Sequence, residues 1–292
     1  MIIETPEIFD YDQCLRYLTR SDQERLFYVK DRSVLRLTDI DGEKILFQID
    51  CNTDNNLTVS FHPSSVSLNV QLTIESYIKE WFDLDTSLSD FYDTVGREPI
   101  FSKLIEEQYG SRMVRVPDLF EAISWSIIGQ QINLRFAYQV KKALIESFGD
   151  QSYINENSFY LFPKPETVLE ITDSEFKELQ FSKQKMEYIR IVSEAIQSDQ
   201  LSKARLLELG PEAAKLELIK LKGIGNWSAN YVMMRCLGFR EAFPVEDVGL
   251  HNALKQQLDL PKKPTTAEVR ELTKHWHSWK GYRTYYLWNS LL

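Results

Sequence analysis

"LKGIGNWSANYVMMRCLGFREAFPVEDVGLHNAL" spans residues 221–254 of this 292-residue chain. A helical apolar pattern precedes it behind Pro211, and "NWSANYVMM" follows Gly225, so the stretch predicts a helix-hairpin-helix at about 212–238. Gly223 and Gly225 allow positive φ and leave backbone N–H groups uncovered, where the second helix also presents unpaired N–H groups. Such a turn can bind a phosphate through main-chain atoms, without reading bases. Taken alone, Gly-x-Gly is equally consistent with a plain helix end and turn.

An acidic pair follows the second predicted helix. Because Asp247 lies behind Pro244 and before "VGLHNAL", it is expected at a helix N-terminus, where the dipole favours a carboxylate. Asp247 can be a simple N-cap or a catalytic acid. Trp227 and Tyr231 are four residues apart and share one helix face, so they line either a core or a site.

The first third of the chain has a different pattern of apolar and polar residues. "SVLRLTDIDGEKILFQID" (33–50) predicts a β-hairpin turning at Asp41-Gly42, residues 56–63 predict a third strand, and residues 71–84 predict a helix. A polar connection is expected over 83–99, and after about residue 100 the pattern predicts helices and no strand. The fold class is therefore α+β, with a small α/β domain over 1–95 and an all-α domain over 96–292.

Composition limits the class of protein and its cellular compartment. The chain is 43% hydrophobic, has no apolar run long enough for a membrane helix, and begins without a signal-peptide pattern, which favours a cytoplasmic protein. Its three cysteines lie far apart, which fits neither a disulfide framework nor local metal chelation.

Charge is unevenly distributed. The net charge is −9, but residues 1–100 carry −10 and residues 101–292 carry +1. The later part can therefore accept a polyanion through short-range contacts, although long-range attraction should be weak. An acidic face on a soluble protein explains the charge equally well.

Several segments together resemble one known family. The 221–231 stretch and "FPVEDVGL" (243–250) resemble the helix-hairpin-helix plus Gly/Pro-Asp signature of base-excision DNA glycosylases, most closely the DNA-3-methyladenine glycosylase II branch. Residues 118–149, 162–171, 279–288 and 81–92 are also similar to family segments, so the resemblance covers most of 81–292. Residues 1–80 resemble the family only in their general pattern, which fits the small α/β domain that this branch carries. The resemblance implies that the helical domain is bilobed, with a cleft for DNA.

The resemblance also implies residue roles. Asp247 is the expected catalytic acid, with Glu246 a bystander, and Trp227 and Tyr231 are expected in the base pocket. Gly223, Gly225 and Ser228 are expected to bind the DNA backbone. Gln131 matches the side chain that fills the gap left by a flipped base, and Gln130 a neighbour that touches the duplex. Arg283 matches a family arginine, and Trp288 is left unassigned because the spacing before it differs.

The chemistry supports these roles without the resemblance. Breaking an N-glycosidic bond creates a cationic sugar, which a fixed carboxylate stabilises. A base inside a duplex must be flipped out, and an aromatic cleft attracts a cationic alkylated purine.

Two absences refine this interpretation. Relatives that also cut the strand carry a nucleophilic lysine where this chain has Trp227, and others hold an iron–sulfur cluster with C-terminal cysteines that this chain lacks after Cys236. We therefore expect no metal cofactor, with a monovalent cation at the hairpin carbonyls left open.

The sequence thus predicts a monomeric, monofunctional glycosylase that excises alkylated purines from damaged double-stranded DNA. Two alternatives remain at this point: a non-enzymatic hairpin protein that only binds DNA, and a glycosylase acting on oxidised bases.

Overall fold

A computed structural model describes all residues, 1–292. The strands are β1 (Ile2–Ile3), β2 (Phe27–Lys30), β3 (Ser33–Ile40), β4 (Glu43–Cys51), β5 (Leu57–His62), β6 (Gln151–Ile154) and β7 (Asn157–Tyr160). The helices are α1 (Tyr11–Leu18), α2 (Leu68–Trp81), α3 (Leu88–Val95), α4 (Pro99–Glu107), α5 (Leu119–Ile128), α6 (Leu134–Phe148), α7 (Pro165–Glu170), α8 (Asp173–Glu178), α9 (Lys183–Gln197), α10 (Lys203–Lys220), α11 (Asn226–Arg235), α12 (Val248–Gln257), α13 (Thr266–Leu272) and α14 (Lys280–Asn289). None of these helices has both the length and the apolarity that crossing a bilayer requires.

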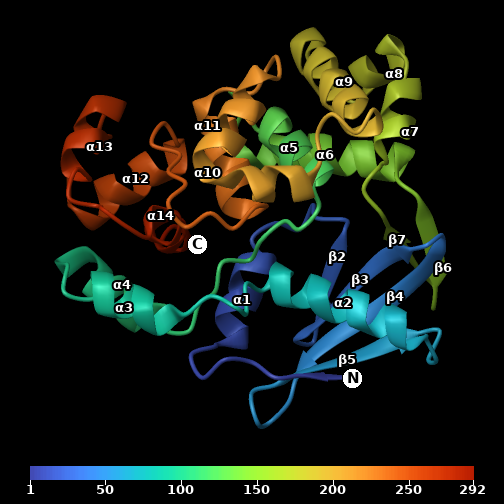
Figure 1. Cartoon of the computed structure of the whole chain (residues 1–292), viewed down its shortest axis with the longest axis horizontal. Helices are drawn as coiled ribbons and strands as arrows, with labels where there is room; N and C mark the ends of the chain where they lie inside the picture. The colour runs from blue at the N-terminus through green and yellow to red at the C-terminus, as the bar shows by residue number, and fades with distance from the viewer.

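The N-terminal part is an antiparallel sheet in the order β1-β5-β4-β3-β2, with α1 and α2 beside it (Figure 1). The predicted turn is confirmed: Asp41 and Gly42 both have positive φ, 54° and 85°, and join β3 to β4. That pair of left-handed residues matches the twist of a two-residue hairpin. The predicted third strand is β5, and the predicted helix is α2, which begins three residues earlier than expected.

Two predictions about secondary structure were wrong. The connection expected over 83–99 contains α3, which Ser87 caps by accepting a hydrogen bond from the Asp90 N–H. The helical part also contains a β-hairpin, β6–β7, where no strand was expected. Its turn residues, Asn155 and Glu156, both have positive φ without a glycine, so the usual hairpin signal is absent.

The β6–β7 hairpin is held by tertiary contacts. It reaches from the helical part down to the sheet (Figure 1), where Phe159 packs with Leu37 and Leu46. The Tyr28 hydroxyl donates a hydrogen bond to the Ser158 carbonyl at 3.0 Å. This hairpin therefore depends on the sheet for its stability, which explains why its own sequence gives a weak signal.

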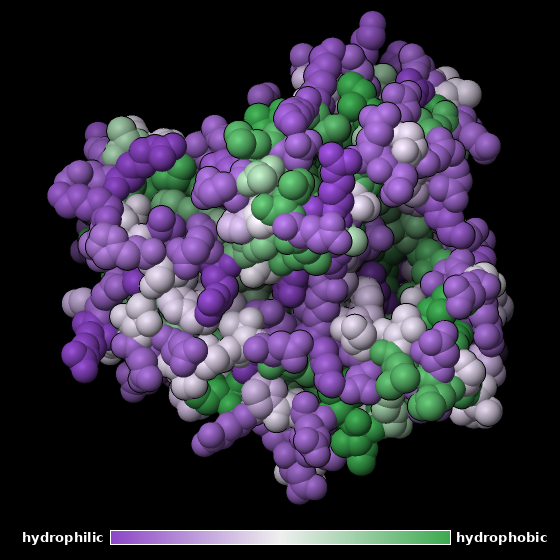
Figure 2. Space-filling model, viewed as in Figure 1, coloured by the Kyte–Doolittle hydropathy of each residue, from purple (hydrophilic) through white to green (hydrophobic).

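The helices form two groups with α10 and α11 between them (Figure 1). On one side α5, α6, α7, α8 and α9 pack together, and on the other α14 contacts α4 and α12. The bilobed arrangement expected from the resemblance is thus present. The domain boundary at residue 95 stays a prediction. Figure 2 shows a largely hydrophilic face with a hollow between the helical region and the sheet region.

Candidate active site

The helix-hairpin-helix consists of the second half of α10, residues 221–225 and α11. Gly210, at φ 73°, kinks α10, and Pro211 starts its second half. Gly223 has φ 94°, and a Cβ there would lie 2.2 Å from the Tyr188 ring, so both backbone and packing require glycine. Gly225 differs from the expectation of positive φ: its φ is −91°, and a Cβ would meet nothing within 4 Å. Gly225 therefore keeps a surface open rather than permitting a turn.

Unpaired N–H groups cluster at this open surface. The first hydrogen bond of α11 runs from the Ala229 N–H to the Gly225 carbonyl, and no side chain caps the helix. The N–H groups of Asn226, Trp227 and Ser228 consequently have no partner in the chain. Together with the positive end of the helix dipole, they form a site suited to a phosphate. The Ser228 side chain is buried, so this residue offers its N–H rather than its hydroxyl.

Asp247 is the N-cap of α12, as its position behind Pro244 predicts. Its Oδ1 accepts hydrogen bonds from the Leu250 N–H at 2.7 Å and from the Trp288 indole N–H at 2.8 Å. Its Oδ2 accepts one from the Trp227 indole N–H at 2.9 Å. Three donors thus face a half-buried carboxylate and fix its orientation.

An aromatic row adjoins this carboxylate. The Trp227 and Tyr231 rings are stacked, with centroids 5.8 Å apart and planes at 30°. The Tyr231 ring also lies 6.3 Å from that of Trp288. The structure therefore brings the predicted Trp227, Tyr231 and Asp247 together and adds Trp288, which sequence reasoning left unassigned.

Gly249 explains how Trp288 reaches Asp247. A Cβ on Gly249 would lie 2.9 Å from Asp247 Oδ1 and 3.1 Å from the Trp288 indole nitrogen. Only glycine leaves room for both groups, so the glycine of "EDVGL" was the sequence signal for a partner at this point.

Arg283 and Glu246 lie outside this cluster. The Arg283 guanidinium is buried and forms ion pairs with both carboxylate oxygens of Glu98, each at 2.7 Å. It thereby joins α14 to the start of α4. Glu246 accepts a hydrogen bond from Arg270 at 3.2 Å. Neither side chain forms a hydrogen bond or ion pair with Asp247.

The two glutamines after α5 have different surroundings. Gln131 is exposed and has φ 57°, so its side chain projects from a tight turn. The Gln130 amide instead donates to the Gly223 carbonyl at 2.8 Å and to the Ser228 hydroxyl at 3.1 Å. Gln130 thus ties the Gln131 turn to the hairpin, a connection that sequence reasoning missed.

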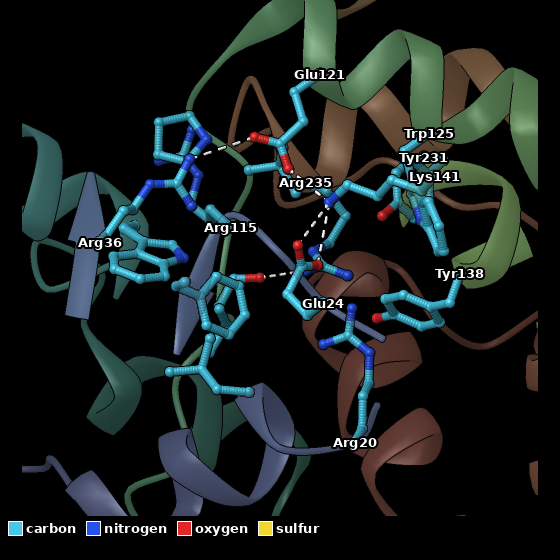
Figure 3. Close-up of a pocket in the computed structure, with 16 residues that line it drawn as sticks. Arg20, Glu24, Arg36, Arg115, Glu121, Trp125, Tyr138, Lys141, Tyr231 and Arg235 are labelled. Atoms are coloured by element: carbon cyan, nitrogen blue, oxygen red, sulfur yellow. Dashed lines mark hydrogen bonds and ion pairs between the residues drawn. The ribbon is translucent and has the colours of Figure 1, made fainter. Parts of the chain in front are cut away.

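A cavity lies beyond Tyr231, between the helices and the N-terminal part (Figure 3). It is lined by Leu18, Arg20, Glu24, Phe27, Arg36, Trp81, Val114, Arg115, Val116, Pro117, Glu121, Trp125, Tyr138, Lys141, Tyr231 and Arg235. Two of its aromatic side chains, Trp125 and Tyr138, pack at 4.7 Å between ring centroids. The sequence offered no signal for most of this lining, because it comes from distant segments.

Buried ion pairs cross this cavity. Lys141 lies between Glu24 at 3.1 Å and Glu121 at 3.0 Å, and Arg36 reaches Glu121 at 3.4 Å (Figure 3). Burial alone would raise the pKa of Glu24, but Lys141 and the N–H groups of Leu26 and Arg25 outweigh it and lower that pKa to about 2. Although burial opposes its charge, Lys141 has a raised pKa because both carboxylates face it. These pairs link the N-terminal part to α5 and α6.

The arrangement defines a class of protein. A hairpin that presents free N–H groups beside a fixed carboxylate and an aromatic row fits a protein that grips a nucleic-acid backbone and acts on a base.

The comparisons with known proteins agree with this class. Residues 124–278 match the model of the HhH-GPD superfamily base excision DNA repair protein, and residues 3–123 match that of the 8-oxoguanine DNA glycosylase N-terminal domain. The chain is 37% identical over 293 residues to a DNA-3-methyladenine glycosylase of Bacillus subtilis, covering 100% of this chain and 97% of that protein.

Two solved structures share the fold. A 3-methyladenine DNA-glycosylase from Archaeoglobus fulgidus has a TM-score of 0.86 at 21% identity, covering 99% of this chain and 97% of that one. An 8-oxoguanine glycosylase/lyase of Clostridium acetobutylicum in complex with double-stranded DNA has a TM-score of 0.75 at 17% identity, covering 99% and 97%.

The chain belongs to the HhH-GPD superfamily of base excision DNA repair proteins. It is a DNA glycosylase, an enzyme that hydrolyses N-glycosyl bonds, and DNA is its partner. The alternative of a hairpin protein that only binds DNA is therefore wrong.

Proposed function

We propose that this enzyme is a monofunctional glycosylase that flips alkylated purines, such as 3-methyladenine and 7-methylguanine, out of double-stranded DNA and excises them. The observation that carries the proposal is the Asp247 carboxylate, oriented by two indole N–H groups at one end of an aromatic row. The name of the Bacillus subtilis relative, DNA-3-methyladenine glycosylase, supports the same substrate class.

The chemistry follows from that geometry. The bond between the sugar anomeric carbon and the base nitrogen breaks, and its electron pair leaves with the base. The Asp247 carboxylate stabilises the cationic sugar and orients a water, whose oxygen bonds to the anomeric carbon while its proton passes to the carboxylate or to solvent. An alkylated base carries positive charge, so it leaves as a neutral molecule and stacks well on electron-rich rings. This reaction requires neither a metal cofactor nor an iron–sulfur cluster, and no residue role depends on a cation at the hairpin carbonyls.

The hairpin binds the DNA backbone. We assign Gly225 and the N–H groups of Asn226 and Ser228 to one backbone phosphate, with Gly223 shaping the turn. Gln131 is the side chain placed to fill the gap in the duplex, and Gln130 positions its turn through the bonds to Gly223 and Ser228. We propose that a single chain carries all these groups and acts as a monomer.

A glycosylase for oxidised bases that also cuts the strand is the second candidate, because residues 3–123 match an 8-oxoguanine glycosylase domain. Trp227 argues against it, since its indole occupies the position where such relatives place the nucleophilic lysine. Two lysines flank the hairpin turn, and each is engaged in an ion pair. Lys222 pairs with Glu187 at 2.5 Å, and Lys220 pairs with Glu217 at 2.6 Å.

One experiment separates the two candidates. The enzyme is incubated with dimethyl-sulfate-treated duplex and, separately, with a duplex containing 8-oxoguanine, each with and without borohydride. We expect release of methylated purines, intact strands and no trapped adduct. Release of 8-oxoguanine with a borohydride-trapped complex would contradict the proposal.

A further inference from the structure

The turn that carries Gln131 has an unfavourable backbone conformation. Gln131 has φ 57°, in the left-handed region that residues with a Cβ seldom adopt. The turn also follows directly on α5, whose last carbonyls have no partner within the helix. Such a conformation persists only where the surrounding structure holds it. The contacts around this turn therefore fix the direction of the Gln131 side chain.

Two sets of hydrogen bonds hold the turn. The first runs to the hairpin, where the Gln130 amide donates to the Gly223 carbonyl and the Ser228 hydroxyl. The second runs to α9, where the Lys185 ammonium donates to the Ile128 carbonyl at 2.8 Å. Ile128 is the last residue of α5, and no backbone N–H reaches its carbonyl. Lys185 is thus the hydrogen-bond donor that satisfies this carbonyl.

Lys185 is a half-buried lysine without a carboxylate partner. Lys220 and Lys222, beside the hairpin, each pair with a glutamate, whereas the Lys185 ammonium forms only the bond to the backbone carbonyl. Burial lowers the pKa of Lys185, with no nearby carboxylate to oppose the shift. Its charge is directed at the carbonyl end of α5, where the negative end of the helix dipole favours a cation.

A separate contact fixes α9 against the hairpin. Tyr188 follows Lys185 by three positions on this helix, and its ring fills the space beside Gly223, where a Cβ would come within 2.2 Å of it. α9 also packs against α5. Since these contacts do not involve the ammonium, removing it should loosen the turn while α9 keeps its place.

We propose that Lys185 is a positioning residue for base flipping, whose ammonium holds the turn that directs Gln131 into the gap left by the flipped base. This inference rests on the proposed function, which assigns the gap-filling role to Gln131. A side chain that is already in place stabilises the flipped state more than one that must be ordered on binding. Lys185 therefore increases the fraction of bound DNA with a flipped base, rather than the affinity for intact duplex.

Binding to two duplexes measures this role. One contains an uncleavable abasic analogue, which offers Gln131 a gap in the stack, and the other is undamaged. Both are titrated by anisotropy at several salt concentrations, with the wild type and two variants of Lys185. Lys185→Met keeps most of the length of the side chain without its ammonium, and Lys185→Arg keeps a charged donor. The control is Lys183→Met, since Lys183 is exposed two positions earlier on the same helix.

For Lys185→Met we expect the preference for the abasic duplex over the undamaged one to fall about fivefold or more, since a hydrogen bond from a charged donor is lost. Single-turnover release of methylated purines should slow by a similar factor for each base, because fewer bound duplexes hold a flipped base. Lys185→Arg should retain most of the preference and of the rate. Lys183→Met should leave both unchanged.

A double-mutant cycle with Gln131→Ala tests whether Lys185 acts through Gln131. If it does, Lys185→Met should cause little further loss of preference in the Gln131→Ala enzyme. Fully additive losses would overturn the inference. A direct contact between Lys185 and a phosphate would weaken binding to both duplexes equally and reduce the salt dependence of log affinity by about one unit of slope. That result would also overturn it.

The outcomes separate this inference from the proposed function. If Gln131→Ala lowers the preference but a folded Lys185→Met does not, the inference fails and the proposed function stands. If Gln131→Ala leaves the preference unchanged, the gap-filling role of Gln131 fails, and this inference fails with it. Failure of the wild type to release methylated purines would contradict the proposed substrate class alone. If Lys185→Met does not fold, Lys185→Gln is judged by the same preference.

Discussion

Replacing Asp247 with Asn isolates the charge of the carboxylate, because the two side chains have nearly the same shape. Asp247 accepts two hydrogen bonds on Oδ1 and one on Oδ2. The Asn oxygen can take the Oδ1 position and keep the bonds from Leu250 and Trp288. Its NH₂ group then faces the Trp227 indole N–H at 2.9 Å, a donor opposed to a donor.

The substitution should change the free energy of unfolding and the rate of base release by different amounts. The opposed donors should lower the free energy of unfolding by about 1 kcal/mol, the low end for an unsatisfied group, since the site is only half-buried. Loss of the charge that stabilises the sugar cation should slow base release by about 10²–10³-fold, or about 2.7–4 kcal/mol in activation free energy. The rate effect should therefore greatly exceed the stability effect.

The assay is single-turnover release of methylated purines, with denaturant unfolding and titration of a duplex containing an abasic analogue measured in parallel. Glu246→Gln is the matched control, since Glu246 is the adjacent carboxylate but bonds to Arg270 instead of the site. Asp247→Asn should bind the analogue duplex nearly as well as the wild type. A folded Asp247→Asn enzyme that kept more than about a tenth of the wild-type rate would refute the catalytic role, as would an equal loss in Glu246→Gln.

Other perturbations test the remaining parts. Gly225→Val should leave unfolding unchanged, because its Cβ has open space, but weaken binding to damaged and undamaged duplex by similar factors in anisotropy titrations at fixed salt; loss of lesion preference alone would contradict the phosphate role. Gly249→Ala should displace Trp288 from Asp247 and slow base release more than it weakens duplex binding. An equal loss of base release and duplex binding would contradict this role of Gly249. Chelation by EDTA should leave base release at the untreated rate, and a loss restored by added metal would show that a cofactor takes part. The pKa of Glu24 is lowered from 4.5 to about 2. Its ionised form therefore contributes up to about 3 kcal/mol to the free energy of unfolding above pH 4.5, and this contribution is lost as pH falls toward 2. In denaturant unfolding, the difference in stability between the wild type and Glu24→Gln should shrink over that pH range.

Local signals account for the features that sequence reasoning found. The turn at Asp41-Gly42, the hairpin glycines and the Asp247 N-cap are each encoded within a few residues, since capping and turn geometry depend on adjacent backbone. Trp227 and Tyr231 share a helix face because of their spacing alone. The fold class and the centre of the site were therefore predictable.

Only the tertiary structure decided which distant side chains complete the site. Trp288 is 41 positions from Asp247 and reaches it because α14 packs on α12 around the space that Gly249 leaves. Arg20 and Tyr231, more than 200 positions apart in the sequence, line one cavity because the N-terminal part packs beside the helices. The β6–β7 hairpin likewise exists through Phe159, which packs on the sheet. Such contacts depend on the packing of whole segments, which no local pattern of residues encodes.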